Sequence, residues 1–183
     1  MIVYNDFCFA APPCTGVPWF VHACQLAGFG PAFIHRAHVP FPRIWKDPKR
    51  LHVTLVRHPC VWLHYIYRFL CNDPVGCDML GPFNSLDKSS WEVFLSDYLK
   101  KCPGGVGEVF NTYQADSVIR SEDLPNAFDE LLMALNIPCS LRWSASQLSV
   151  HHSYNSDNCM SIGLHRRVAQ AEQELIKEYD YCV

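Results

Sequence analysis

Hydrophobic positions along this chain alternate between short continuous runs and longer stretches with one apolar side. Four of the short runs predict strands. The clearest of them, Leu51 to Val56, is rich in β-branched residues and has the near-continuous apolarity of a strand buried in a parallel sheet. The other three predicted strands are Phe7 to Ala11, Ala32 to Arg36 and Asp116 to Arg120.

Helix signals follow these runs. Pro18 suits the first turn of a helix, because its missing N–H would have no partner there, and Gly28 suits the position after the last turn. We predict this helix from Pro18 to about Ala27. Ser89-Ser90-Trp91-Glu92 is typical of a capping box and predicts a second amphipathic helix that ends near Lys101. Further helices are predicted over residues 60–71, 106–113, 122–137 and 162–179.

The alternation of strands and helices predicts an α/β fold, a three-layer sandwich with a central parallel sheet. At 183 residues the chain is long enough for a substantial core, and we predict a single domain over residues 1–183. In open parallel sheets, ligands bind beyond the carboxyl ends of the strands. Two polar turns stand at such ends here, one after the first predicted strand and one after Leu51 to Val56.

Composition narrows the classes of function. Apolar residues make up 49% of the chain and aromatic residues 13%, which excludes a disordered protein. The net charge of −3 argues against a broad nucleic-acid interface, and no apolar run reaches the roughly 18 residues of a membrane span. We therefore expect a cytoplasmic protein with no signal peptide, no nucleic-acid partner and no membrane partner.

Ten cysteines raise the alternatives of disulfides or a zinc site. No two of them have the Cys-x-x-Cys spacing that zinc sites usually show, so no metal is expected. Several, such as Cys8, Cys24 and Cys71, lie inside apolar runs. We interpret the cysteines as small buried hydrophobic residues in a reducing compartment.

The first polar turn, PPCTGVP over residues 12–18, has the chemistry of an anion site. Gly16 permits a positive φ angle or a close approach of the backbone, and the helix that follows directs free N–H groups and a positive dipole into the turn. Thr15 adds a hydroxyl donor. The Walker pattern Gly-x-x-x-x-Gly-Lys-Ser/Thr is absent, and the alternative is a proline-rich turn with a structural role only.

The second polar turn contains Arg57-His58-Pro59. A guanidinium at the carboxyl end of a buried strand is well placed for a bidentate grip on phosphate. The alternative is that Arg57 pairs with a carboxylate such as Asp47 or Glu122.

Together these stretches resemble the sulfotransferase family, whose first loop reads Pro-Lys-Ser-Gly-Thr-Thr-Trp. PCTGVPW occupies that register, with Gly16 and Trp19 in place. The family's second motif, Arg-x-Pro followed by a helix with aromatic residues, is similar to VRHPCVWLHYIYRFL. Its later Arg-x-Glu-Asp-Leu run is similar to RSEDL at residues 120–124. The resemblance covers most of the chain, in the same order.

The resemblance implies a P-loop NTPase-like sulfotransferase topology and 3′-phosphoadenosine 5′-phosphosulfate as co-substrate, with no metal. Three departures bear on activity. Cys14 replaces the loop lysine that steadies the leaving phosphate, Val17 and Pro18 replace two threonines, and Tyr65 replaces a helix serine that touches the 3′-phosphate. The nucleotide-binding positions that the resemblance implies are Cys14, Thr15, Gly16, Val17, Pro18, Trp19, Arg57 and Tyr65.

The reaction implied is in-line transfer of a sulfuryl group from the nucleotide to a hydroxyl or amine of a small-molecule or glycan acceptor. The transfer needs a base near the acceptor, and the candidates are His35, near the end of the second predicted strand, and His38, just after that strand. Arg36, Arg43 or Lys46 could replace the missing lysine; each of these residues is otherwise a solvated loop residue. The alternative function is a non-catalytic protein of the same fold that binds a nucleotide or an anion. A nucleotide kinase-like enzyme is disfavoured by the missing Walker lysine.

Overall fold

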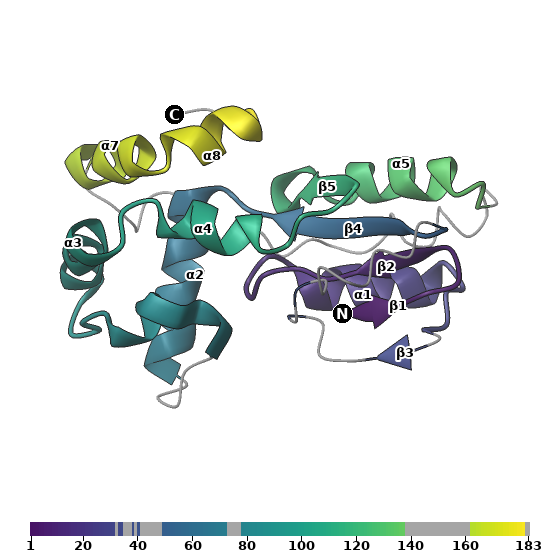
Figure 1. Cartoon of the computed structure of the whole chain (residues 1–183), viewed down its shortest axis with the longest axis horizontal. Coiled ribbons are helices and arrows are strands. Elements are labelled where there is room, and N and C mark those ends of the chain that lie inside the picture. Colours follow the sequence, from purple (N-terminus) through teal and green to yellow (C-terminus); the bar gives the residue numbers. More distant parts are fainter. Residues whose placement is uncertain are drawn as a thin grey trace. The chain divides into compact units, whose positions relative to one another are not determined.

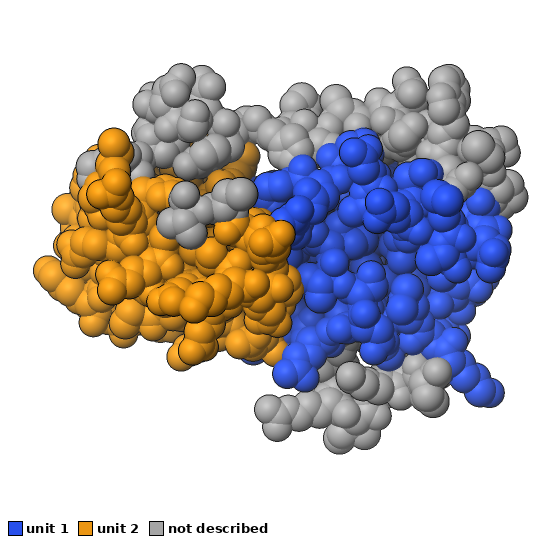
Figure 2. All heavy atoms as spheres, turned by 90° about the horizontal axis from the view of Figure 1, so that it is seen from above, with its two compact units in different colours: residues 1–57, 112–152 blue, residues 58–111, 153–183 orange. Residues whose placement is uncertain are grey.

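The structure of the chain is a computed structural model that describes residues 1–31, 33–34, 38, 40, 49–72, 78–137 and 162–181. It divides into two compact units, which Figure 2 colours separately. Unit 1 comprises residues 1–57 and 112–152, and unit 2 comprises residues 58–111 and 153–183. Each unit therefore combines two segments that are far apart in the sequence. The single domain expected over residues 1–183 stays a prediction.

Unit 1 is built on a five-stranded sheet with the strand order β3-β1-β2-β4-β5 (Figure 1). β2 pairs with β4 in parallel, and so does β4 with β5, whereas β1 runs antiparallel to both of its neighbours, β2 and β3. β3 therefore runs in the same direction as β2, β4 and β5. The strands are β1 (Ile2–Val3), β2 (Phe7–Phe9), β3 (Phe33–Ile34), β4 (Leu51–Val56) and β5 (Ser117–Arg120).

The α/β class and a mostly parallel sheet are confirmed, but β1 departs from the fully parallel sheet that the sequence predicted. The chain reverses between β1 and β2, where the Tyr4 N–H donates to the Phe7 carbonyl at 2.9 Å. A strand of two residues is too short for a hydrophobic pattern of period two to identify. The sheet thus contains one reversed strand that the sequence pattern missed.

β4 lies between β2 and β5, and five of its six residues are buried. This position explains its near-continuous apolarity, because a central parallel strand is covered on both faces. Phe9 pairs with Val53 at the end of β2, and Val56 pairs with Arg120 at the end of β4. The carboxyl ends of β2 and β4 are therefore neighbours, as parallel pairing requires.

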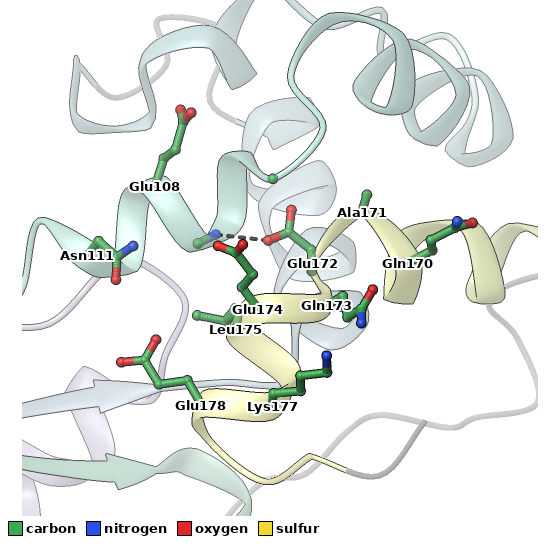
Figure 3. A pocket seen from close by; sticks show the side chains of 12 residues that line it. Glu108, Asn111, Gln170, Ala171, Glu172, Gln173, Glu174, Leu175, Lys177 and Glu178 are labelled. Atoms are coloured by element: carbon green, nitrogen blue, oxygen red, sulfur yellow. Dashed lines mark hydrogen bonds between the residues drawn. The ribbon is translucent and has the colours of Figure 1, made fainter.

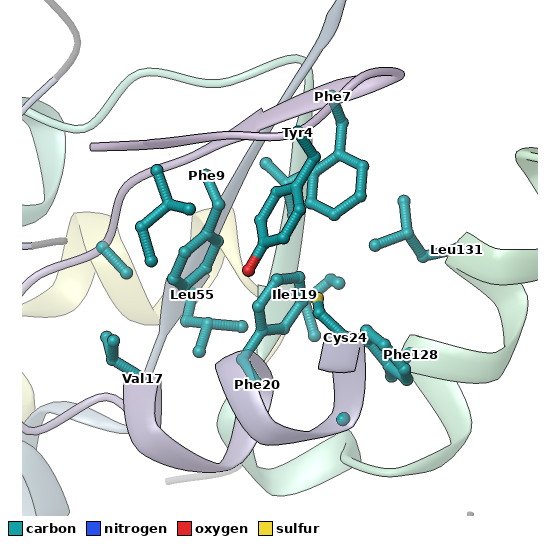
Figure 4. Packing of buried hydrophobic residues seen from close by; sticks show 14 of the residues in the cluster. Tyr4, Phe7, Phe9, Val17, Phe20, Cys24, Leu55, Ile119, Phe128 and Leu131 are labelled. Carbon is teal, nitrogen blue, oxygen red and sulfur yellow. The ribbon is translucent and has the colours of Figure 1, made fainter. Parts of the chain in front are cut away.

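Helix α1 (Val17–Leu26) packs on this sheet through aromatic contacts (Figure 4). The Phe20 ring stacks on Phe9 with the centroids 4.1 Å apart and meets Phe128 edge to face at 5.2 Å. The helix ends as predicted, because Gly28 has a φ angle of 83° and its N–H donates to the Gln25 carbonyl at 3.1 Å. Phe128 brings α5 (Asn126–Ala134) onto the same core as α1.

The helix predicted over residues 122–137 begins later than expected. A short 3₁₀ turn, η2 (Ser121–Asp123), comes first, and α5 starts only after Pro125. Leu124 has an extended conformation, with φ −66° and ψ 140°. The helical conformation is disfavoured for a residue that precedes proline, which explains why one continuous helix does not form here.

Unit 2 is helical, and its core is aromatic. The Trp62 ring, fully buried, meets Phe83 at 5.3 Å and Phe110 at 5.4 Å between centroids, and Phe83 stacks on Tyr98 at 5.7 Å. These contacts join four of the unit's elements. The elements of unit 2 are α2 (Pro59–Asn72), η1 (Asp78–Ser85), α3 (Trp91–Lys101), α4 (Gly105–Asn111), α7 (Ile162–Ala171) and α8 (Gln173–Glu178).

Two predictions for unit 2 need correction. The N-cap of α3 is Ser90, whose Oγ accepts the Val93 N–H at 3.2 Å, so the capping box with Ser89 as the cap was wrong by one residue. The helix predicted over residues 162–179 is two helices, α7 and α8, divided at Glu172. Glu172 is only 2% exposed and has a role of its own, described below.

The described cysteines carry free thiols, and their burial differs. Cys8, Cys24 and Cys60 are buried, as small apolar residues would be, whereas Cys71 is exposed and departs from that interpretation. Burial raises the pKa of the Cys24 thiol to about 12. Within the part of the chain that the structure describes, no helix combines the length and apolarity needed to cross a membrane.

Candidate functional site

The turn between β2 and α1 reverses the chain through two residues in the left-handed region. Cys14 has a φ angle of 62° and Gly16 a φ angle of 98°. Gly16 is the N-cap of α1, and no side chain caps that end of the helix. A Cβ at Gly16 would stand 3.8 Å from the nearest side-chain atoms, so the position demands glycine for its backbone angle rather than for space.

The threonine of the turn bonds inward. The Thr15 side chain is fully buried, and its Oγ1 donates to the Pro12 carbonyl at 2.7 Å. A hydroxyl has one proton to donate, so this proton is committed to the turn itself. Thr15 therefore shapes the loop, and the contact of its hydroxyl with an anion stays a prediction.

Ser121 directly follows β5 and bonds to the same turn, so the ends of three strands meet there. Its Oγ lies in hydrogen-bond contact with the Thr15 carbonyl and 2.8 Å from the Val56 carbonyl. Sequence reasoning missed this residue. The available signal was its position, because Ser121 directly follows β5 at the edge of the sheet where Thr15 and Arg57 follow their own strands.

Arg57 connects the two polar turns. The residue is only 8% exposed, and its Nη1 donates to the Cys14 carbonyl at 2.9 Å. The turns after β2 and β4 thus lie side by side, at the ends of adjacent parallel strands. Because the effective dielectric constant is low around a buried group, the charge of such a guanidinium interacts strongly with any anion that binds nearby. Asp47, one of the carboxylates considered as an alternative partner, lies outside the described residues.

The side chains of Val17 and Trp19, at the start of α1, pack within unit 1. Val17 is buried, and the Trp19 ring meets Phe128 edge to face with centroids 5.6 Å apart. Pro18 is exposed and supplies no N–H. What Val17 and Trp19 offer a ligand is therefore the main-chain N–H groups of the first helical turn, which have no partner within the helix.

His38 lies beside Ala11, the residue that directly precedes the turn. Its Nδ1 lies 3.1 Å from the Ala11 carbonyl, and the Tyr113 hydroxyl donates to the His38 carbonyl at 2.5 Å. The other predicted base, His35, lies outside the described residues, as do Arg36, Arg43 and Lys46. Tyr65 belongs to α2 in unit 2, and its contact with the nucleotide stays a prediction.

A second candidate site is a hollow of about 510 Å³ in unit 2, lined by α4, the end of α7 and α8 (Figure 3). Exposed carboxylates of Glu108, Glu174 and Glu178 give it an acidic rim. Glu172 also lines this hollow, and its carboxylate accepts several hydrogen bonds. It accepts the Tyr98 hydroxyl, the Gly107 N–H at 2.9 Å and the Val106 N–H at 3.3 Å.

Burial raises the pKa of the Glu172 carboxyl, although hydrogen bonds from Tyr98 and from the N–H groups of Gly104, Val106 and Gly107 oppose the shift. Sequence reasoning missed this carboxylate, yet a signal was present. Val168 lies four residues before Glu172, and Leu175 and Ile176 lie three and four residues after it, and all three are buried. Glu172 therefore falls on the apolar face of the predicted helix, where a carboxyl needs partners.

In comparisons with protein-family models, with curated proteins and with solved structures, nothing matches this chain. Its function must therefore be inferred from the residues at the turn and their contacts.

Proposed function

We propose that unit 1 binds a 3′-phosphoadenosine nucleotide at the turn between β2 and α1, within a P-loop sulfotransferase-like topology. We propose further that the protein transfers the sulfuryl group of 3′-phosphoadenosine 5′-phosphosulfate to a hydroxyl or amine of a small-molecule or glycan acceptor. The observation that carries the proposal is the 2.9 Å hydrogen bond from Arg57 to the Cys14 carbonyl. It sets a buried cation beside the uncapped end of a helix.

Two sources of positive potential meet at this turn. The ten-residue helix α1 directs its first N–H groups toward the turn, and the Arg57 guanidinium lies against the turn's own backbone. Phosphate and sulfate groups bind well to helix N-termini and to guanidinium groups. The combination supports an anionic ligand without the lysine of a Walker loop.

In the proposed transfer step, His38 is the base. Its Nε2 accepts the proton of the acceptor hydroxyl or amine while the acceptor atom forms a bond to sulfur. The bond between sulfur and the bridging oxygen of the 5′-phosphate breaks, and adenosine 3′,5′-bisphosphate leaves with the electron pair. Main-chain N–H groups of the turn and Arg57 stabilise the charge that develops on the leaving phosphate.

A non-catalytic nucleotide- or anion-binding protein is the second candidate, and Cys14 favours it. Cys14 stands where the resemblance expects a lysine, and the Thr15 hydroxyl is already bonded to Pro12. Loss of one donor to a developing charge lowers a rate by roughly 10² to 10³. Binding would survive this loss better than catalysis, because the main-chain donors remain.

Adenosine 3′,5′-bisphosphate at a hundred times its dissociation constant is expected to stabilise the full chain by roughly 2.7 kcal/mol. For a chain of this length the melting temperature then rises by about 5–10 °C, measured by differential scanning fluorimetry. Adenosine at the same concentration is the control and is expected to give no rise. If millimolar bisphosphate leaves the melting temperature unchanged, both nucleotide proposals fail. Transfer of ³⁵S from the labelled co-substrate to a panel of acceptors then separates the enzyme from the binder.

Replacing Cys14 by lysine is expected to tighten bisphosphate binding by about tenfold, because a hydrogen bond to a charged group contributes about 1.5–3 kcal/mol. Isothermal titration calorimetry measures the change. Cys14→Gln is the matched control, since it adds length and a donor without charge. Equal affinities of the lysine and glutamine variants would contradict the proposed register of the turn.

A further inference from the structure

We infer that Tyr113 and the Ala11 carbonyl fix His38 in the tautomer whose Nε2 accepts a proton, so that Tyr113 is a positioning residue for the transfer. The inference rests on the proposed function for its chemical purpose, but the hydrogen bonds that carry it are independent of any ligand. Both partners belong to unit 1, as does His38.

The Ala11 carbonyl determines which ring nitrogen carries the proton. A carbonyl oxygen only accepts hydrogen bonds, so at 3.1 Å the His38 Nδ1 must be the donor. In the neutral ring the second nitrogen, Nε2, then has a lone pair and no proton. Ala11 is fully buried and immediately precedes the turn, which sets this ring at the carboxyl end of β2.

Tyr113 fixes the main chain that carries the ring. Its hydroxyl donates to the His38 carbonyl at 2.5 Å, and the residue is only 2% exposed. A buried tyrosine hydroxyl usually finds an acceptor, and here that acceptor belongs to a segment 75 residues away in sequence. Tyr113 is itself anchored to the sheet, because three residues later the Asp116 N–H donates to the His52 carbonyl of β4 at 3.0 Å.

The two contacts have a chemical consequence. A base must present a lone pair to the acceptor hydroxyl or amine, and the Nδ1–H bond to Ala11 leaves Nε2 for that task. When Nε2 takes the proton, the ring becomes a cation and its bond to the Ala11 carbonyl becomes charge-assisted and stronger. Ala11 therefore stabilises the protonated base, while Tyr113 maintains the position of the residue.

The test is the tautomer of His38 in the full chain, read from ¹⁵N chemical shifts of the labelled imidazoles without nucleotide. The His38 signals are assigned by their loss in His38→Gln. At alkaline pH we expect the Nδ1–H tautomer to predominate by about fivefold, which corresponds to a net hydrogen bond of about 1 kcal/mol. A predominant Nε2–H tautomer in the wild-type protein overturns the inference.

Tyr113→Phe removes the hydroxyl alone, and we expect it to reduce the tautomer ratio at His38 at least twofold. Tyr4→Phe is the matched control, since Tyr4 is also buried in unit 1 and its hydroxyl is near Cys24. The control is expected to leave the His38 ratio unchanged. If Tyr113→Phe also leaves it unchanged, or both variants reduce it equally, Tyr113 has no positioning role. The bisphosphate melting shift tests the proposed function separately, because the tautomer is measured without ligand.

Discussion

Replacing Glu172 by alanine is expected to lower the melting temperature of the full chain by on the order of 10 °C. The substitution leaves three donors, the Tyr98 hydroxyl and the N–H groups of Val106 and Gly107, without the carboxylate that accepts from them. Each unsatisfied buried donor costs about 1–3 kcal/mol, so a loss of about 3–5 kcal/mol is expected. Thermal unfolding followed by circular dichroism measures the change.

Glu174→Ala is the matched control, since Glu174 lines the same hollow but is exposed. An exposed substitution of this kind is expected to change stability by less than about 0.5 kcal/mol. Equal losses in the two variants would mean that negative charge at the hollow, rather than the buried bonds of Glu172, controls stability.

The penalty for Glu172→Ala is also expected to depend on pH. Burial raises the folded-state pKa of this carboxyl above its ordinary value of 4.5, so the folded state binds the proton more tightly than the unfolded state. The stabilisation is therefore fully present below the unfolded pKa and decreases as the pH rises through the folded pKa. The difference in stability between wild type and variant should be larger at pH 5 than at pH 8, and a difference that grows with pH would contradict the assignment.

Sequence patterns identified the elements whose environment is simplest. β4 has the bounds that its apolar run predicted, Leu51–Val56, because a central parallel strand is buried on both faces and its sequence records that burial. β1 was missed, since two residues carry no periodicity. The helix over residues 162–179 was predicted as continuous because local propensity does not register that Glu172 must reach donors on α3 and α4.

The candidate site was likewise predictable only in part from the sequence. The sequence predicted that the turns after β2 and β4 stand at the carboxyl ends of parallel strands, and the bond from Arg57 to the Cys14 carbonyl shows that these turns are adjacent. The inward bonds of the turn were beyond sequence reasoning. Nothing in the local sequence of Ser121 or Tyr113 indicates that each hydroxyl would bond to a main-chain carbonyl 65 or 75 residues away. Long-range side-chain bonds of this kind depend on the packing of the completed sheet.

These inward bonds change how the turn would bind an anion. With the Thr15 hydroxyl committed to Pro12 and no lysine at Cys14, we expect an anion to be bound by main-chain N–H groups of the turn and by the charge of the Arg57 guanidinium. Such donors are fixed before the ligand arrives, so binding requires little reorganisation of the turn. Arg57 then has two effects, since it supplies charge and also fixes the backbone that presents the N–H groups.

Replacing Arg57 by alanine is therefore expected to weaken binding of adenosine 3′,5′-bisphosphate by at least about tenfold, because a hydrogen bond to a charged group contributes about 1.5–3 kcal/mol and the Cys14 carbonyl loses its partner as well. Isothermal titration calorimetry of the full chain measures the dissociation constant. Arg57→Lys is expected to recover only part of the affinity, since an ammonium keeps the charge but lacks the planar guanidinium geometry.

Arg50→Ala is the control for net charge. Arg50 precedes β4 at the opposite end of the strand, where its Nε donates to the Asn5 carbonyl at 3.2 Å. Both substitutions remove one positive charge from unit 1, but only Arg57 lies at the turn after β2. If Arg50→Ala weakens bisphosphate binding as much as Arg57→Ala does, the ligand responds to the overall charge of the unit, and the turn between β2 and α1 is not its binding site.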